Sequence, residues 1–133
     1  MIVDTSAIIA ILRAEDEAGA ILLALANAEQ RLMSASSYLE AGIVMANDKS
    51  PRGVERLNLL IEKASIDIVP TSESDAVAGI AAHIRYGRGS GQKAKLNFGD
   101  CFVYALAKSR NLPLLFKGDD FIHTDIEPAL KPA

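Results

Sequence analysis

Short apolar segments that alternate with helical stretches are the feature that most limits what this chain can fold into. Four segments fit short strands: Ile2-Val3, Leu32-Met33, Ile66 to Val69 and Leu114 to Phe116. Between them, apolar residues recur at intervals of three and four, the period of a helix with one buried face. Strands separated by helices pair in parallel through right-handed crossovers. The sequence therefore predicts an α/β fold, with a parallel sheet covered by helices on both faces.

Residues that cap helix N-termini stand ahead of the helical stretches. Asp4-Thr5-Ser6 follows the first strand, and Ser36-Ser37 follows the second. Thr71-Ser72 can cap a later helix and Asn97 the last one, because short polar side chains accept hydrogen bonds from the free N–H groups there. The helix after Ser72 is expected to bury one stripe, formed by Val77, Ile80, Ala81 and Ile84.

Length and cysteine content favour one domain in a reducing compartment. A chain of 133 residues can bury a core without disulfides, so we expect a single domain over residues 1–133. The lone cysteine, Cys101, cannot form an internal disulfide, and no histidine at a suitable spacing marks it as a nucleophile. No uncharged stretch approaches the ~20 residues of a membrane span. We therefore expect a cytoplasmic protein that does not enter a membrane.

The distribution of charge is more informative than its sum. The net charge of −3 has the wrong sign for a general nucleic-acid binder. However, no carboxylate occurs between Asp75 and Asp100, and that interval holds a glycine-rich loop with several basic residues. They are predicted to make sequence-independent contacts with phosphates, and we call them the basic strip: Arg85, Arg88, Lys93 and Lys95.

Four carboxylates are expected at one edge of the sheet. Asp4, Glu40 and Asp100 each fall near a helix N-terminus, and Asp119 follows the last strand. In a parallel α/β sheet these ends gather on one rim. Three of the four acids also have a purely structural explanation. Asp4 can be an N-cap, and Glu40 can form a capping box with Ser37. Asp100 can be an acid in the first turn of its helix, where the helix dipole stabilises a negative charge.

Converging carboxylates repel one another unless a cation neutralises them. A ligand set made of oxygen atoms, without histidine or cysteine, favours Mg²⁺ or Mn²⁺. Such an ion supports hydrolysis of a phosphodiester bond. Thr5 or Ser6 could orient a water or a phosphate, although capping is the better explanation of both residues.

Four motifs in order resemble those of PIN-domain ribonucleases. They are the opening Met-Ile-Val-Asp-Thr-Ser-Ala, Ser-Tyr-Leu-Glu-Ala-Gly-Ile-Val around Glu40, Leu-Asn-Phe-Gly-Asp-Cys-Phe-Val-Tyr-Ala-Leu-Ala around Asp100, and Leu-Leu-Phe-Lys-Gly-Asp-Asp-Phe near the end. Within that family, the chain is most similar to the VapC-type toxins of toxin–antitoxin pairs. The resemblance extends from Met1 to about Ile126.

The resemblance implies a three-layer fold with a five-stranded parallel sheet. It implies a Mg²⁺- or Mn²⁺-dependent endoribonuclease that acts as the toxin of its pair, with Asp4 and Asp100 as metal ligands and Glu40 and Asp119 completing the site. It also implies a homodimer and a VapB-type antitoxin whose C-terminal segment covers the active site. The identity of the RNA and the number of metal ions are left open.

The fourth acid is ambiguous by one residue, because Asp119 and Asp120 are neighbours. Adjacent side chains that leave a strand point in different directions, so one of them is expected to face the site. Gly118 permits a tight turn, which favours Asp119 as that acid.

Two other classes of protein were weighed. A receiver-type signalling domain needs an acidic pair after the first strand and an acceptor aspartate after a middle strand, and neither is present. A dehalogenase-type phosphatase needs a second aspartate where Ser6 stands. An interaction module that kept the fold and lost the chemistry would have no need for all four acids.

Overall fold

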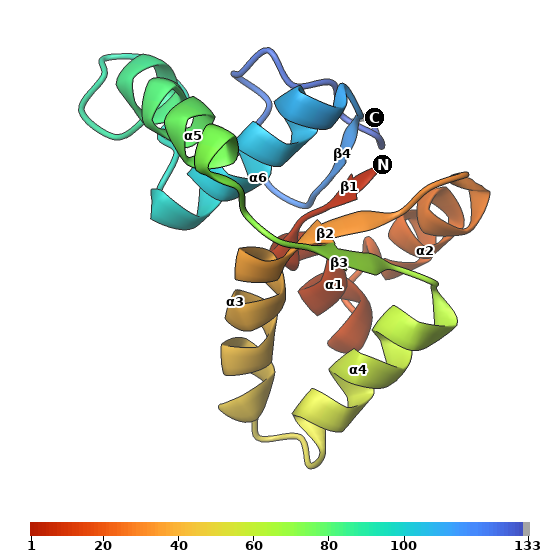
Figure 1. Ribbon diagram of the computed structural model, residues 1–133. Coiled ribbons are helices and arrows are strands. Elements are labelled where there is room, and N and C mark those ends of the chain that lie inside the picture. Colours follow the sequence, from red (N-terminus) through yellow and green to blue (C-terminus); the bar gives the residue numbers. More distant parts are fainter. Residues whose placement is uncertain (132–133) are drawn as a thin grey trace.

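A parallel sheet lies at the centre of the chain (Figure 1). The computed structural model describes residues 1–131. Within them, four strands are arranged in the order β3-β2-β1-β4, and all neighbours are parallel. Ile2 of β1 is in register with Leu32 of β2 and with Leu114 of β4. The strands are β1 (Ile2–Val3), β2 (Leu32–Ser34), β3 (Asp67–Val69) and β4 (Leu114–Leu115).

The expected fifth strand is reduced to one bridge in the described part of the chain. Leu114 pairs in parallel with Pro128 beyond the outer side of β4. The Leu114 amide donates to the Glu127 carbonyl at 2.9 Å, and the Ala129 amide donates to the Leu114 carbonyl at 2.8 Å. Proline has no N–H to offer a further neighbour, which suits an edge position. The prediction of five strands was therefore wrong by one within residues 1–131, whereas the parallel α/β architecture is confirmed.

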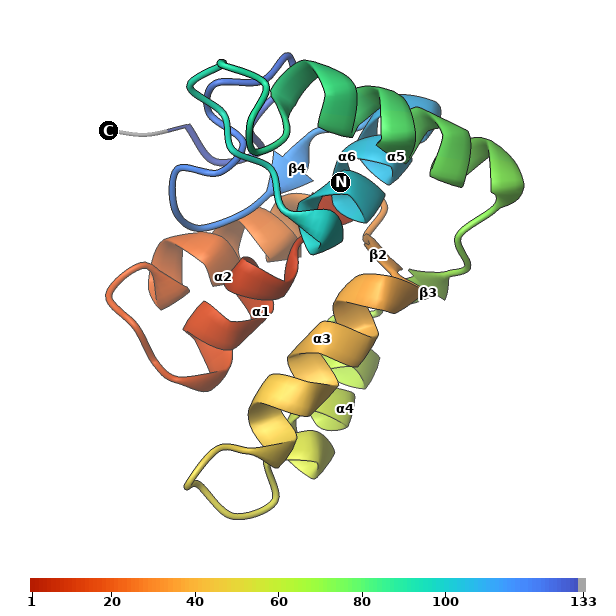
Figure 2. The ribbon, with the colours of Figure 1, turned by 90° about the vertical axis from the view of Figure 1, so that its left-hand side faces the viewer.

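Helices cover both faces of the sheet (Figures 1 and 2). Successive strand residues point to opposite faces. Val3 packs with the first four helices, and its neighbour Ile2 packs with the last two. The helices are α1 (Thr5–Leu12), α2 (Ala18–Asn27), α3 (Ala35–Ala46), α4 (Gly53–Lys63), α5 (Glu73–Tyr86) and α6 (Phe98–Arg110). No helix within residues 1–131 combines the length and the apolar character needed to cross a membrane.

Helix α5 buries a different face from the expected one. Val77, Ile80 and Ile84 are 62%, 63% and 72% exposed, and Ala81 is exposed too, so the predicted buried stripe was wrong. The buried residues of α5 are Ala82 and Tyr86. The cause is tertiary: α5 packs against α6 rather than on the sheet, as Figure 1 shows. Gly79 lies against Cys101 in that contact, the Tyr86 and Tyr104 rings meet at 5.8 Å between centroids, and the aliphatic residues of the predicted stripe are left on the outside.

Helix capping agrees with the sequence at three of four starts. Asp4, Ser72 and Asn97 cap α1, α5 and α6, and the last two form complete capping boxes. Helix α3 begins earlier than expected, because Ser34 accepts from the Ser36 amide and is the N-cap. The prediction that Ser36-Ser37 caps this helix was wrong.

Candidate active site

Asp4 stands where β1 ends and α1 begins. Its Oδ2 atom accepts from the Ser6 amide at 3.1 Å and from the Ser6 hydroxyl at 2.5 Å. The side chain is buried, and burial raises the pKa of Asp4 to about 6. The bonds from Ser6 oppose that shift, whereas the charges of Glu40 and Asp120 add to it. The N-cap role of Asp4 is thus confirmed. Its ionised carboxylate is also destabilised by burial and by the neighbouring charges.

Ser6 also fixes the segment that follows β4. Its Oγ accepts from the Lys117 amide at 2.9 Å, so one hydroxyl joins the end of β4 to Asp4. The Lys117 ammonium group forms ion pairs with Glu15 at 3.1 Å and Glu17 at 3.2 Å. Thr5 donates to the Ser37 carbonyl at 3.0 Å. Both hydroxyls predicted to be near the site therefore have structural partners.

Asp100 lies in the first turn of α6. Its Oδ2 accepts from the Asn97 amide at 3.0 Å, and its own amide donates to the Asn97 side chain at 2.9 Å. Burial raises the pKa of Asp100 to about 7, and the bond from Asn97 opposes this. The charges of Asp120, Asp4 and Glu40 raise it further. Asp100 is therefore a capping residue and also part of a group of repelling carboxylates.

Glu40 reaches the same group from α3. It is exposed, and its charge raises the pKa of both Asp4 and Asp100. The capping box expected with Ser37 does not form, because the helix begins at Ser34. Glu40 Oε2 lies 3.0 Å from the point where a Cβ atom on Gly99 would stand, so its carboxylate faces the start of α6.

Asp119 and Asp120, which follow β4, differ in their electrostatic effect on the other acids. Both are exposed. Asp120 is among the charges that raise the pKa of Asp4 and of Asp100, and Asp119 is not. Gly118 adopts a φ of +101°, as the expected tight turn requires, and Phe121 is buried beyond the turn. The electrostatics thus favour Asp120, although the sequence argument favoured Asp119.

The donor set fits a hard cation. Asp4 and Asp100 use Oδ2 for hydrogen bonds, and within the described residues neither Oδ1 has a partner. No buried side-chain polar atom is left without a partner in that part of the chain, so these Oδ1 atoms reach the surface. Among residues 1–131, however, no three His, Cys, Asp or Glu side chains are arranged to enclose a metal ion. The carboxylate oxygens are suitable ligands for a divalent cation, but the side chains would have to move closer together to enclose one.

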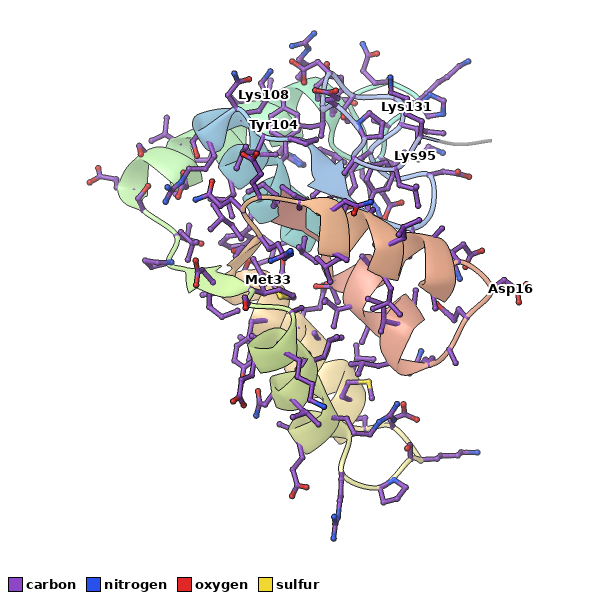
Figure 3. All side chains as sticks on the ribbon, turned by 90° about the vertical axis from the view of Figure 1, so that its right-hand side faces the viewer. Asp16, Met33, Lys95, Tyr104, Lys108 and Lys131 are labelled. Carbon is purple, nitrogen blue, oxygen red and sulfur yellow. The ribbon has the colours of Figure 1, made fainter. Side chains whose placement is uncertain are left out.

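The basic strip divides into two parts. Arg85 is 3.7 Å from the Asp125 carboxylate and 4.7 Å from the centre of the Tyr86 ring. Asp125 also accepts from Tyr104 at 2.6 Å and from Lys108 at 3.0 Å, two α6 side chains that are labelled in Figure 3. Sequence reasoning missed this cluster, because Asp125 has no local pattern that indicates its partners. The other members of the strip are exposed and form no ion pair within residues 1–131: Arg88, Lys93 and Lys95.

Comparison with known families agrees with this fold. The sequence model of the PIN domain matches residues 1–127. Ribonuclease VapC28 of Mycobacterium tuberculosis and VapC ribonuclease Mb0625 of Mycobacterium bovis are each 55% identical to the chain over 130 residues, which is 98% of both chains. The chain belongs to the PIN-domain family, in its group of VapC ribonucleases.

Solved structures of distant sequence share the fold. The crystal structure of M. tuberculosis VapC20, described as a toxin that cleaves the sarcin–ricin loop, has a TM-score of 0.73 at 14% identity and covers 96% of this chain and 98% of that one. A toxin–antitoxin complex from Klebsiella pneumoniae has a TM-score of 0.71 at 22% identity and covers 93% and 92%. At these identities, the likeness establishes the architecture only.

The raised pKa of Asp100 predicts a specific effect of pH on stability. The folded protein holds a proton on this carboxyl at pH values where the unfolded chain, with a pKa near 3.8, has lost it. The stability that this proton contributes is present below about pH 4 and is lost as the pH rises to about 7. Asp100→Asn should therefore be more stable than the wild type above pH 7, by roughly 1–3 kcal/mol, and lose that advantage in acid. Urea unfolding in EDTA at several pH values measures the difference, and two parallel curves would contradict the argument.

Proposed function

We propose that this protein is an endoribonuclease that requires Mg²⁺ or Mn²⁺ and acts as the toxin of a toxin–antitoxin pair. One observation carries the proposal: Asp4 and Asp100 are buried beside further acids, with pKa values of about 6 and 7. Such a cluster of ionised carboxylates destabilises the folded protein unless a cation neutralises it, which is why it points to a cation-binding site. The relatives that are named as ribonucleases, and match nearly the whole chain, support RNA as the substrate.

In this proposal Asp4 and Asp100 are the metal ligands, and Glu40 and one acid of the Asp119-Asp120 pair complete the site. A bound divalent ion lowers the pKa of water and polarises a phosphoryl oxygen. The protein's own contribution is to hold the carboxylates. Ser6 fixes one oxygen of Asp4 and Asn97 fixes one oxygen of Asp100, which leaves the second oxygen of each to face the ion. Outer contacts of this kind orient metal ligands.

The exposed part of the basic strip supports contact with an RNA backbone. Arg88, Lys93 and Lys95 are exposed and form no ion pair within residues 1–131, and the loop that carries them leads directly to α6 and Asp100. Lysine and arginine side chains supply sequence-independent phosphate contacts. Arg85 is the weakest candidate of the four, because Asp125 and Tyr86 already hold it.

An antitoxin partner and a cytoplasmic location belong to the same proposal. Similar folds occur in a toxin–antitoxin complex from K. pneumoniae and in FitAcB from Neisseria gonorrhoeae. We expect a VapB-type antitoxin to cover the site with its C-terminal segment. RNA substrates and the reduced state of Cys101 fit the cytoplasm.

A homodimer is supported by the outer face of α5. Val77, Ile80 and Ile84 lie at intervals of three and four on one side of the helix, and all are exposed. An open groove of about 620 Å³ between α5 and α6, lined in part by Ile80 and the 82% exposed Phe98, extends the apolar surface. Figure 2 views the side of the molecule that carries α5 and the start of α6. An apolar surface of this kind marks an interaction site.

The charges of α5 suit pairing with a second copy. Glu73 and Asp75 lie in its first turn, Arg85 in its last turn, and Arg88 just beyond the end. Two copies of α5 that pack about a two-fold axis perpendicular to the helix run antiparallel, so the acidic end of each helix meets the basic end of the other. A dimer interface with two-fold symmetry must be self-complementary in this way.

The first test of the function is Asp4→Asn. This variant should lose RNA cleavage by about a hundredfold or more, because outer contacts of metal ligands alone are worth 10- to 100-fold. Its melting temperature should stay the same or rise, since one repelling carboxylate is gone. Asp67→Asn is the matched control, because Asp67 is an exposed acid at the start of β3, the opposite end of the sheet. Full cleavage by chelator-treated Asp4→Asn after Mg²⁺ addition would sink the assignment.

The second test separates the neighbouring acids. Asp120→Asn should raise the Mg²⁺ concentration needed for half-maximal cleavage about tenfold, and Asp119→Asn should change it less than about twofold. The reason is that the charge of Asp120 reaches Asp4 and Asp100. Cleavage rates measured against Mg²⁺ concentration rank the two variants. The reverse ranking would return the fourth position to Asp119.

The third test concerns assembly. Ile80→Glu should weaken a dimer by about 2 kcal/mol or more, because it places a charge in the centre of an apolar interface. Leu23→Glu on α2 is the control, because Leu23 is 64% exposed and Ile80 is 63% exposed. Sedimentation equilibrium reports the dissociation constants. A monomeric wild type, or equal weakening by both substitutions, would refute the α5 interface.

A further inference from the structure

Glu40 differs from the two buried acids in how it is held. Asp4 is fixed by Ser6, and Asp100 is fixed by Asn97. Among residues 1–131, no hydrogen bond or ion pair involves the Glu40 carboxylate, although the side chain is long and exposed. A free glutamate side chain has many rotamers, and confining it costs entropy. The position of the Glu40 carboxylate beside the other acids therefore depends on the surface that this side chain contacts.

That surface is the first turn of α6 at Gly99. A Cβ atom built on Gly99 would lie 3.0 Å from Glu40 Oε2 and 3.5 Å from the Asn97 side-chain oxygen. The first distance is tighter than ordinary contact, so a Cβ atom there would push the flexible Glu40 carboxylate aside by a few tenths of an ångström. Gly99 is helical, and glycine lowers helix stability relative to alanine. The N-terminal end of a helix also favours a carboxylate.

We propose that Gly99 is a positioning residue for Glu40: its missing side chain leaves room for the Glu40 carboxylate against the start of α6, next to Asp100. The placement follows from the geometry alone. Its consequence for metal binding rests on the proposed function. The substitution Gly99→Ala should displace the flexible end of Glu40 and leave the backbone of α6 in place.

Metal-free crystal structures of the wild type and of Gly99→Ala test the placement. The proposal expects an unchanged α6 with its Asn97–Asp100 capping box and a Glu40 carboxylate withdrawn from the helix. Gly19→Ala on α2 is the control, because a Cβ atom there meets nothing within 4 Å. A Glu40 carboxylate that keeps its position in Gly99→Ala would overturn the proposal.

Calorimetric titration with Mn²⁺ tests the consequence. Gly99→Ala should weaken Mn²⁺ binding about ten- to a hundredfold, the range typical of residues that orient metal ligands. In a Glu40→Ala background the same substitution should cost less than about twofold, because the side chain through which Gly99 acts is gone. An equal loss in both backgrounds would show that Gly99 acts on the backbone, and would overturn the proposal. If the wild type binds no Mn²⁺, the proposed function fails, and the crystal comparison still decides the role of Gly99.

Discussion

Burial of carboxylates at the carboxyl end of a small parallel sheet, with repulsion among them added, is the constraint on which the site depends. Burial alone raises the pKa of Asp4 and Asp100, and each further acid adds to the cost of ionising them. The fold tolerates the cost of ionising these carboxylates because the starts of α1 and α6 supply hydrogen-bond donors to them. Ser6 donates twice to Asp4, and the Asn97 amide donates to Asp100. In the proposed function, the same residues that cap these helices would also bind the metal ion, so the two roles are compatible.

The hydroxyl group of Ser6 connects distant parts of the chain. The Ser6 hydroxyl bonds both to Asp4 and to the Lys117 amide, so the end of β1 and the segment after β4 share one anchor. Lys117 is held a second time by Glu15 and Glu17. Asp120 follows three residues later and acts on Asp4 through its charge. Removal of the Ser6 hydroxyl would thus disturb two of the acids together.

Local signals correctly predicted that Asp4 and Asp100 lie at helix starts, because a strand end and a cap residue are both visible in a few letters of sequence. Glu40 was placed in the group because it was expected near a helix N-terminus. Its alternative explanation, a capping box with Ser37, does not form, because Ser34 is the N-cap of that helix. The period of α5 predicted a helix but not its buried face, which depends on packing against α6. The choice between Asp119 and Asp120 depends on a turn with φ +101° at Gly118, whose outcome is set by distant packing of Phe121.

The measurement that tests the central claim most directly is proton release on metal binding. If the carboxylates of Asp4 and Asp100 hold protons near neutral pH and lose them to an ion, Mg²⁺ binding at pH 6 should release about one to two protons, and at pH 8 almost none. Calorimetric titration in two buffers of different ionisation enthalpy counts these protons. Binding that is equally strong at both pH values and releases no proton would contradict the account.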